Sequence, residues 1–534
     1  MIRSVLACSL CLFGASFLGN AQAANGGIPH LEKHGTATQL IVNGKPLLML
    51  GAEVHNSSGS SLDYMRTVWP RLAAIPLNTV FVPVYWELLE PKEGQFDFSL
   101  VDGLIHQARR NHLHIVFLWF GSWKNGLSSY PPLWVKKDTK RFPRVIEKGG
   151  KEAEILSTFG KNTLEADKTA FAALMRHIRE VDGQAHTVLM MQVENEVGVL
   201  GDSRDRSPAA NQAFNGAVPA KLLNYIQQHK NSLFPQFKKI WDAAGDKTSG
   251  TWSEVFGSNA DEMFMAWHYG LYVNQVAAAG KAQYPVPMYA NTWLRGPNVP
   301  PGKFPSGGAQ PETIDVWRAA GKAIDLYAPD IYARNFEDWC DWYNQEGNPL
   351  FMAETSGGAR GQANVFYAVG KDNAISFSPF GIDSWRDKDN LLGKSYSVLM
   401  QLAPLILQHQ GDGTMTGFVL NTDHPSVTAT MKGYKLDISM DRIFGGKAKH
   451  GYGLVIAIGP NEFVGAGSGF RVKFSPASAG PPNAGIGYIE EGSYAGGAWV
   501  PGRRLNGDES DQGQYWRFSS YGTEIERAVA YRYR

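Results

Sequence analysis

Short, almost continuously apolar segments alternate with longer amphipathic ones over the first three quarters of this chain. Strands of a parallel sheet that are buried on both faces read as such runs. Helical patterns stand between them: Phe171, Leu174, Met175 and Ile178, for example, recur at i, i+3, i+4 and i+7. The runs predict eight strands, at Leu47–His55, Asn78–Trp86, His112–Trp119, Thr187–Val193, Val286–Trp293, Ile324–Tyr332, Pro349–Thr355 and Ala374–Pro379.

Eight units of strand followed by helix predict a (β/α)8 TIM barrel, which we place at residues 24–411. The competing arrangement is an open, doubly wound sheet. That fold favours a glycine-rich phosphate-binding turn after an early strand, and no such turn is present. The glycines of 465–469 have the wrong spacing and lie in a β-rich region, so we interpret them as a turn.

The pattern changes after Gly411, where helical periodicity stops. Turn-forming clusters such as 478–483 and 506–508 then separate short segments with alternating polarity. We therefore expect a C-terminal antiparallel domain that resembles a β-sandwich over residues 412–534, with a role in capping or stabilising the barrel. The segments expected as strands are Thr414–Leu420, Gly453–Ile458, Phe470–Phe474, Gln514–Phe518 and Ile525–Tyr533.

The first residues have the pattern of a secretory signal peptide. Arg3 precedes the apolar run 5–18, and Ala21-Gln22-Ala23 supplies a small-residue cleavage site. The run is short and lacks the flanking charge of a stop-transfer helix, so we expect no transmembrane segment. Cleavage after Ala23 predicts an exported protein, periplasmic or extracellular. It also leaves Cys340 as the single cysteine, which we expect to be a buried small hydrophobic residue.

The composition narrows the class of partner. Lys and Arg total 51 against 50 for Asp and Glu, a balance that argues against nucleic acid as the main partner. Aromatic residues reach 12%, which suits stacking on sugars as well as core packing. We expect neither a cofactor nor a catalytic metal: His112 and His114 lie at the start of the third strand, away from a barrel's active end, and no His-Glu-x-x-His motif occurs.

Two of the predicted strands have carboxylate side chains at their C-terminal ends. The fourth strand ends in Glu194-Asn195-Glu196 and the seventh in Glu354. The active site of such a barrel lies where its strands end, so these side chains are expected to face each other across the mouth. A carboxylic acid and a carboxylate about 5–5.5 Å apart perform glycoside hydrolysis with retention of configuration. We expect Asn195, beside Glu196, to hydrogen-bond a sugar hydroxyl.

The sequence also resembles glycoside hydrolase family 35, the β-galactosidases. The segment Gln192–Gly198 reads QVENEVG and is similar to the acid/base segment of that family. A second similarity is the run Trp86–Phe98, which reads WELLEPKEGQFDF; a weaker one is Asn43–Pro46 leading into Glu53–His55. The resemblance implies that Glu196 is the acid/base and Glu354 the nucleophile, with Glu194 supporting them.

Several positions depart from that family. His55 is followed by Asn56 in place of a tyrosine, Ser122 stands where a glutamate commonly binds galactose hydroxyls, and the residues after Thr355 lack the usual aromatic pair. Galactose is the favoured sugar, but glucose, mannose and arabinose stay open. The candidate substrate-binding residues are Asn195, Glu53, His55, Tyr85, Ser122, Trp123, Asn291, Trp293 and Tyr332.

The sequence thus predicts an exported, retaining exo-β-galactosidase whose substrate is a carbohydrate, such as the galactose-bearing side chains of plant xyloglucan. Two alternatives remain at this point. One keeps the chemistry but changes the sugar or the acceptor, giving another exo-glycosidase or a transglycosylase. The other is a non-catalytic carbohydrate-binding protein on a similar barrel, which has no need of the carboxylate pair.

Overall fold

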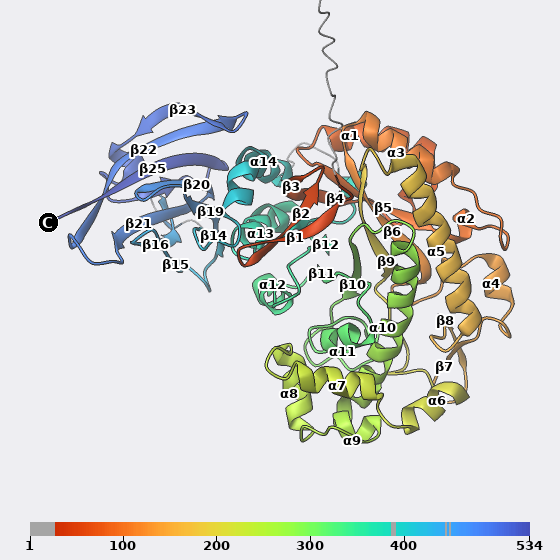
Figure 1. The fold of residues 1–534 in the computed structure, drawn as a ribbon. Coiled ribbons are helices and arrows are strands. Elements are labelled where there is room, and N and C mark those ends of the chain that lie inside the picture. Colours follow the sequence, from red (N-terminus) through yellow and green to blue (C-terminus); the bar gives the residue numbers. More distant parts are fainter. Residues whose placement is uncertain (1–26, 386–390, 444–445, 448–449) are drawn as a thin grey trace, which may run out of the picture.

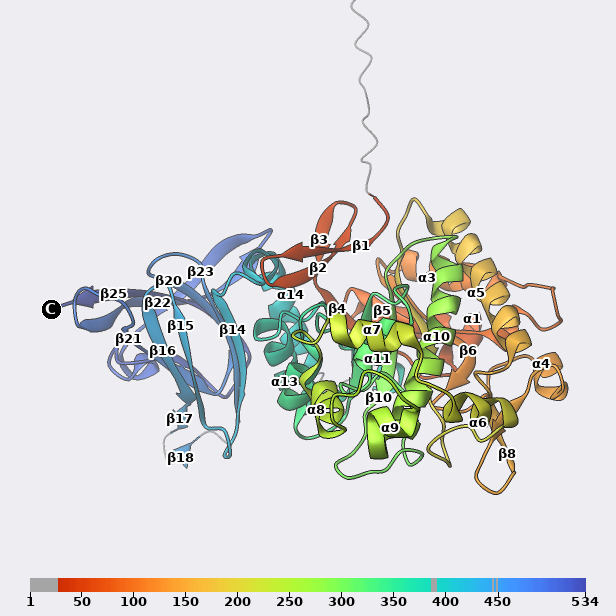
Figure 2. The ribbon, with the colours of Figure 1, turned by 60° about the horizontal axis from the view of Figure 1, so that its bottom comes forward.

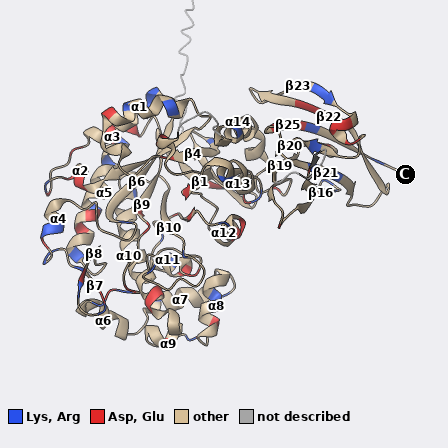
Figure 3. Cartoon of the chain, turned by 180° about the vertical axis from the view of Figure 1, so that it is seen from behind, with Lys and Arg blue, Asp and Glu red and all other residues tan. Residues whose placement is uncertain are grey.

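The computed structural model describes residues 27–385, 391–443, 446–447 and 450–534, so the expected signal peptide at 1–23 lies outside it. A barrel and a C-terminal β domain lie side by side along the molecule (Figure 1). Acidic and basic residues are interspersed over both parts (Figure 3), as expected for a formal net charge of +1. No helix within the described ranges is long and apolar enough to span a membrane.

Eight parallel strands form the barrel, in the order β12-β11-β10-β9-β6-β5-β4-β13. Parallel bridges from Phe351 to Ser376 and from Thr355 to Pro379 bring its last two strands together. All eight segments expected as strands are confirmed. The barrel strands are β4 (Met49–Glu53), β5 (Thr79–Tyr85), β6 (His114–Lys124), β9 (Val188–Asn195), β10 (Met288–Trp293), β11 (Leu326–Ile331), β12 (Glu354–Thr355) and β13 (Ser376–Phe377).

Helices surround the barrel and cover its outer face (Figure 1). In α5 the residues at helical spacing, from Phe171 to Ile178, are fully buried, so the predicted amphipathic helix is confirmed. The helices are α1 (Leu62–Ala73), α2 (Trp86–Leu89), α3 (Ser99–Arg110), α4 (Leu133–Lys137), α5 (Lys161–Asp182), α6 (Pro208–Asn215), α7 (Ala220–Gln228), α8 (Pro235–Ala243), α9 (Trp252–Phe256), α10 (Ala260–Lys281), α11 (Ile314–Ala320), α12 (Phe336–Tyr343), α13 (Gly358–Gly370) and α14 (Leu391–His409).

A small antiparallel sheet that the sequence did not predict precedes the barrel. Its strands are β1 (His30–His34), β2 (Ala37–Val42) and β3 (Lys45–Leu47). Leu40 and Val42 of β2 pack with Met49 and Leu326, which lie at the starts of their barrel strands. The sheet therefore fills the end of the barrel opposite the strand ends that carry the carboxylates. A two-stranded ribbon, β7 (Arg144–Ile146) and β8 (Glu152–Leu156), follows α4.

The C-terminal domain consists of two antiparallel sheets whose apolar residues share one core, as expected for a β-sandwich. Its first sheet also packs against barrel helices: Leu454, Val464 and Ile525 belong to the barrel's own hydrophobic cluster, and α13 and α14 lie between the barrel and this sheet (Figure 2). The first sheet contains β14 (Met415–Leu420), β19 (Gly451–Ala457), β20 (Glu462–Ser468), β25 (Glu524–Tyr533), β22 (Asn483–Ala495) and β23 (Ala498–Leu505). The second contains β15 (Ser426–Met431), β16 (Tyr434–Met440), β21 (Phe470–Pro476) and β24 (Trp516–Phe518); β17 (Arg442–Ile443) and β18 (Gly446–Lys447) pair separately.

Candidate active site

The two carboxylates predicted from the strand ends face one cavity. Glu354 lies in β12, and Glu196 directly follows β9. One carboxylate oxygen of each, together with one of Asp330 from β11, lies within 4.8 Å of the others. All three side chains line a cavity of about 820 Å³. The barrel therefore brings carboxyl groups from β9, β11 and β12 together at one cavity.

The backbone around Glu196 is held in an uncommon conformation. Glu194 and Glu196 have φ of 63° and 44°, in the left-handed region that non-glycine residues rarely adopt. Each such residue costs on the order of 1–3 kcal/mol and persists where its surroundings fix it. The Glu196 N–H donates to the Asn291 side-chain oxygen at 2.9 Å, and the Trp123 N–H donates to Glu194 at 2.8 Å. These contacts aim the Glu196 carboxyl into the cavity.

Burial, and after it the nearby charge of Glu354, raise the pKa of Glu196 to about 7. Lys124 and the amide of Asn125, which donates a hydrogen bond to the Glu196 carboxylate, act in the opposite direction. A carboxyl group with a pKa close to neutral pH can hold a proton and release it in the same cycle. This environment suits the acid/base role expected for Glu196.

The two carboxylate oxygens of Glu354 differ in their hydrogen bonding within the described part of the chain. The Tyr332 hydroxyl donates to Oε2 at 2.9 Å, whereas Oε1 has no hydrogen-bond partner among the described residues. The neighbouring Thr355 hydroxyl donates to the Ile331 carbonyl at 2.8 Å and fixes β12 beside β11. The site thus positions Glu354 while leaving one of its oxygens available to a substrate, as the role of nucleophile requires.

Asp330 is a site residue that the sequence reasoning missed. Its Oδ2 accepts a hydrogen bond from the Asn291 amide at 2.7 Å, and Oδ1 has no partner among the described residues. Burial raises the pKa of Asp330 well above its usual value, as do the charges of Glu354 and Glu196. Strand alternation was the available signal, because Asp330 precedes Tyr332, which was expected at the mouth, by two residues.

Glu53, at the end of β4, is a fourth buried carboxyl in this region. Neither of its oxygens has a partner in the described part of the chain. Burial raises its pKa well above the usual value, and the charge of Glu354 adds to this rise. Glu53 is not among the residues that line the cavity, and its expected contact with substrate stays a prediction.

The structure places Ser122 and Trp123 away from the cavity. The register between β6 and β9 shifts between Trp119 and Lys124, and the intervening residues form a bulge. Within it, the Ser122 hydroxyl donates to Asp167 at 2.5 Å, and the Trp123 ring packs against tyrosines of α10. Ser122 and Trp123, which were expected to bind sugar, therefore do not line the cavity; after the bulge, Lys124 and Asn125 line it instead.

The remaining candidates fall into two groups. Trp293 and Tyr332 line the cavity and are 40% and 44% exposed. His55, Tyr85 and Asn195 do not line it. His55 Nδ1 lies 2.7 Å from Asp383, beside the lining residues Asn56 and Phe380. Tyr85 and Asn195 are buried, and their polar side-chain atoms have no partners among the described residues.

Glu196, Asp330 and Glu354 are also close enough together to hold a cation. Oxygen ligands of this kind suit Mg²⁺ or Ca²⁺. Retaining glycoside hydrolysis, by contrast, uses its carboxyl groups without a metal. The expectation of a metal-free and cofactor-free site stays a prediction. The lone cysteine of the described part, Cys340, is free and buried, as predicted.

Comparisons with known proteins find partial matches to β-galactosidases. A family model described as β-galactosidase, that of glycoside hydrolase family 42, matches residues 70–254, and a domain of unknown function, DUF5597, matches residues 392–517. A β-galactosidase of Xanthomonas manihotis is 27% identical over 206 residues, which are 38% of this chain and 32% of that protein. The human β-galactosidase-1-like protein 3 is 27% identical over 213 residues, 36% of this chain and 30% of that protein. The chain thus spans about a third of the length of these relatives.

Solved structures with a similar fold include the catalytic domain of a β-amylase from Paenibacillus polymyxa, with a TM-score of 0.47 and 12% identity over 66% of this chain and 98% of that one. A β-galactosidase from Bacillus circulans has a TM-score of 0.45 and 13% identity over 67% of this chain and 57% of that one. The family model that matches is that of family 42 and not the expected family 35. What the sequence matches support is a glycoside hydrolase built on a (β/α)8 barrel and similar to β-galactosidases.

Proposed function

We propose that this protein is an exported, retaining exo-β-galactosidase that removes terminal galactose from plant oligosaccharides or polysaccharides, such as xyloglucan side chains. The observation that carries the proposal is the pair Glu196 and Glu354, whose nearest oxygens lie within 4.8 Å in one cavity. Retaining enzymes hold their two carboxyl groups about 5–5.5 Å apart, whereas inverting enzymes separate them by about 6.5–9.5 Å to admit a water molecule. The close pair favours retention.

The reaction proceeds in two balanced steps. Glu354 Oε1 attacks the anomeric carbon, and the bond from that carbon to the leaving oxygen breaks as Glu196 gives the oxygen its proton. The product of this step is a galactosyl ester of Glu354 and a free alcohol. Glu196, now ionised, then takes a proton from water, whose oxygen attacks the anomeric carbon and releases Glu354.

The neighbours of the pair assist at defined atoms. The Tyr332 hydroxyl donates to Glu354 Oε2, which leaves Oε1 for the anomeric carbon. The Asn125 amide donates to the Glu196 carboxylate and stabilises it after it has lost its proton. Both contacts are in place before substrate binds, so little reorganisation accompanies the reaction.

Different observations support galactose as the sugar and export as the destination of the protein. Galactose is suggested by the β-galactosidase model that matches residues 70–254 and by the two β-galactosidase-like relatives. Export rests on the sequence alone, on Arg3, the apolar run 5–18 and the small residues at 21–23. We place the working enzyme in a periplasm or outside the cell.

A panel of 4-nitrophenyl glycosides tests the proposal on the purified mature chain. We expect release from the β-galactoside and little from the β-glucoside, β-mannoside or α-arabinosides. Proton NMR during the reaction should show β-galactose forming first, since retention preserves the configuration. Turnover of a different glycoside would overturn the sugar but keep the mechanism. Sugar binding without any turnover would indicate a carbohydrate-binding protein.

A further inference from the structure

The cavity extends well beyond the carboxylates. Its lining continues along the segment after β10 and onto helix α12, and six apolar side chains form what we call the outer wall. These residues are Trp293, Leu294, Pro297, Val299, Trp339 and Trp342. With about 820 Å³, the cavity lies near the upper end of the range for sites that enclose drug-sized ligands. One sugar ring at the carboxylates leaves much of it unfilled.

The outer wall and the catalytic end differ in chemistry. Around the carboxylates the lining is polar, with Asn56, Lys124 and Asn125, and such groups can pair with the hydroxyls of the galactose that is cleaved. The outer wall offers indole rings and aliphatic groups, which contribute most when they cover apolar surface. The C–H faces of further sugar rings provide that surface, and the interspersed Asn298 and Asn335 can meet their hydroxyl edges.

The outer wall is held in place before any ligand binds. Trp339 and Trp342 pack edge to face, with ring centroids 4.7 Å apart. At the end of β10, the Gln310 amide donates to the Trp293 carbonyl at 2.7 Å, and Arg295 pairs with buried Glu312 at 2.6 Å. An aromatic surface that is already fixed loses little conformational entropy when a ligand binds.

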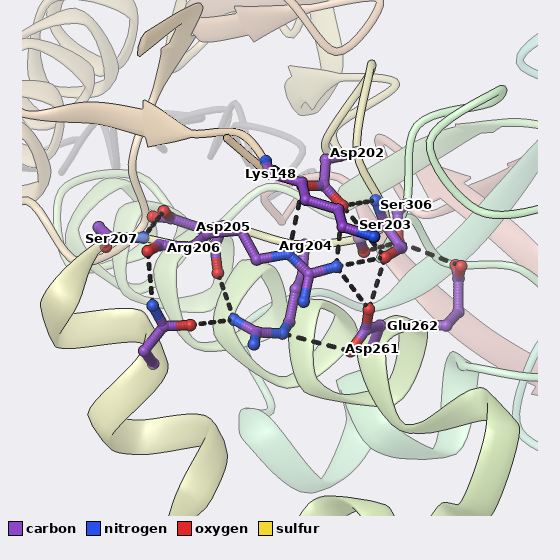
Figure 4. A network of polar contacts seen from close by, with 11 residues as sticks. Lys148, Asp202, Ser203, Arg204, Asp205, Arg206, Ser207, Asp261, Glu262 and Ser306 are labelled. Atoms are coloured by element: carbon purple, nitrogen blue, oxygen red, sulfur yellow. Dashed lines mark hydrogen bonds and ion pairs between the residues drawn. The ribbon is translucent and has the colours of Figure 1, made fainter. Parts of the chain in front are cut away.

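The segment that follows β10 is anchored at its far end as well. Glu262 of α10 accepts hydrogen bonds from the Gly307 N–H at 2.9 Å and from the Ser306 hydroxyl at 3.2 Å. Ser306 also donates to the Ser203 carbonyl at 2.6 Å, and this joins it to the network of charges in Figure 4, in which Arg206 bridges Asp202 and Asp261. The network therefore ties the segment carrying Trp293–Val299 to the body of the barrel.

We propose that the outer wall is a binding site for the sugar chain that leaves, so that the enzyme recognises galactose carried on an oligosaccharide. The proposal rests on the proposed function, because it takes the carboxylates as the point of cleavage. The geometry supports it through the continuity of the outer wall with the catalytic cavity. Aromatic leaving groups of small synthetic substrates can contact the same rings, so the test needs a substrate without one.

Trp342→Ala tests the outer wall, because Trp342 is only partly buried and its removal spares the carboxylates. The two substrates are β-galactosyl fluoride, whose leaving group is one atom, and a galactosylated xyloglucan oligosaccharide. We expect kcat/KM for the oligosaccharide to fall about 10- to 100-fold, at least about ten times more than for the fluoride. Trp342→Phe should recover most of the loss, since it keeps an aromatic face.

Trp499→Ala is the matched control, since it removes the same partly buried side chain from the C-terminal domain. It should alter neither rate. Equal losses on both substrates in Trp342→Ala would overturn the proposal, because they would indicate a structural role. If the wild-type chain cleaves neither substrate, the proposed function fails, and calorimetric binding of the galactose-free oligosaccharide then decides: weaker binding by Trp342→Ala supports the outer wall, and equal binding or none refutes it.

Discussion

The barrel mouth and the C-terminal sheets treat their buried polar groups in opposite ways. At the mouth, buried polar atoms that find no partner in the described part of the chain gather on the strands, on Glu53, Gln192, Asn195, Asp330 and Glu354. In the sheets, buried Glu526 accepts a hydrogen bond from the Trp516 indole at 2.7 Å, and Arg517 donates to both oxygens of Asp441. Among the described residues after 411, the Nε of Arg527 is the one buried side-chain nitrogen or oxygen atom without a hydrogen-bond partner.

The difference separates binding capacity from structural support. A buried polar group without a partner costs on the order of 1–3 kcal/mol, so a stable fold keeps few of them. A group that several substrate hydroxyls will satisfy can remain unpaired until the substrate arrives. The mouth thus keeps buried polar groups that a bound ligand can satisfy, whereas the sheets, which pack against α13 and α14, satisfy theirs within the protein.

The largest difference between the two regions is expected when one buried carboxyl group is replaced in each. Glu354→Gln should lower kcat by at least about 10⁴-fold, because an amide cannot form the glycosyl ester. Glu526→Gln is the matched control: it makes the same substitution at a buried carboxyl of the sheets. It should leave kcat unchanged, since the Trp516 indole can still donate to the new side chain. Initial rates on 4-nitrophenyl β-galactoside measure both effects.

Near-normal turnover by Glu354→Gln would remove Glu354 from the role of nucleophile. Circular dichroism of both variants excludes loss of the fold as the cause. A large loss in Glu526→Gln would contradict the division of roles between the two regions.

The loss expected for Glu196→Ala depends on the leaving group. For an alkyl β-galactoside, whose leaving oxygen needs a proton, kcat should fall by about 10²- to 10⁴-fold. For the 4-nitrophenyl substrate the first step should suffer much less, because that leaving group is stable as an anion. Rates on the two substrates measure the difference, and equal losses would argue against the acid role.

Much of the fold was accessible from the sequence because both faces of a barrel strand are buried. The apolar runs therefore stand out without any alternation, and their last residues indicated Glu196 and Glu354. The same feature concealed Asp330. Asp330 falls inside the apolar run Ile324–Tyr332 and was not singled out, although its side chain shares the direction of Tyr332.

The rest depended on contacts between segments distant in the chain. The bulge that turns Ser122 away from the cavity arises from the pairing of β6 with β9, which no local pattern reveals. The sheet formed by β1, β2 and β3 is defined by its packing under the barrel, through residues such as Leu40. In the C-terminal domain, the sequence analysis missed β15, β16, β20, β22 and β23. Glycines and charges interrupt the alternation of β22 and β23, and the glycines of 465–469, which we expected to form a turn, belong largely to strand β20.

A second matched pair removes a donor from a buried carboxyl in each region. Tyr332→Phe removes the hydrogen bond to Glu354 and should lower kcat about 10- to 100-fold with little change in the free energy of unfolding. Trp516→Phe leaves buried Glu526 without its donor and should lower the free energy of unfolding by about 1–3 kcal/mol with kcat unchanged. Urea unfolding and initial rates separate the two outcomes. An exchange of the two effects would contradict the comparison.

The smallest expected effect concerns Asp330, and it sharpens the account of the mouth. Glu196 must carry its proton to act, so kcat/KM should fall as the pH rises through about 7, the pKa to which burial and the charge of Glu354 raise Glu196. Asp330→Asn should move this limb of the pH profile by less than about half a unit, because burial and the charges of Glu354 and Glu196 raise the pKa of Asp330 well above its usual value and so favour its neutral form, whose charge the amide matches. If Asp330 were ionised instead, its removal would lower the pKa of Glu196, and the limb would shift to lower pH by about a unit or more.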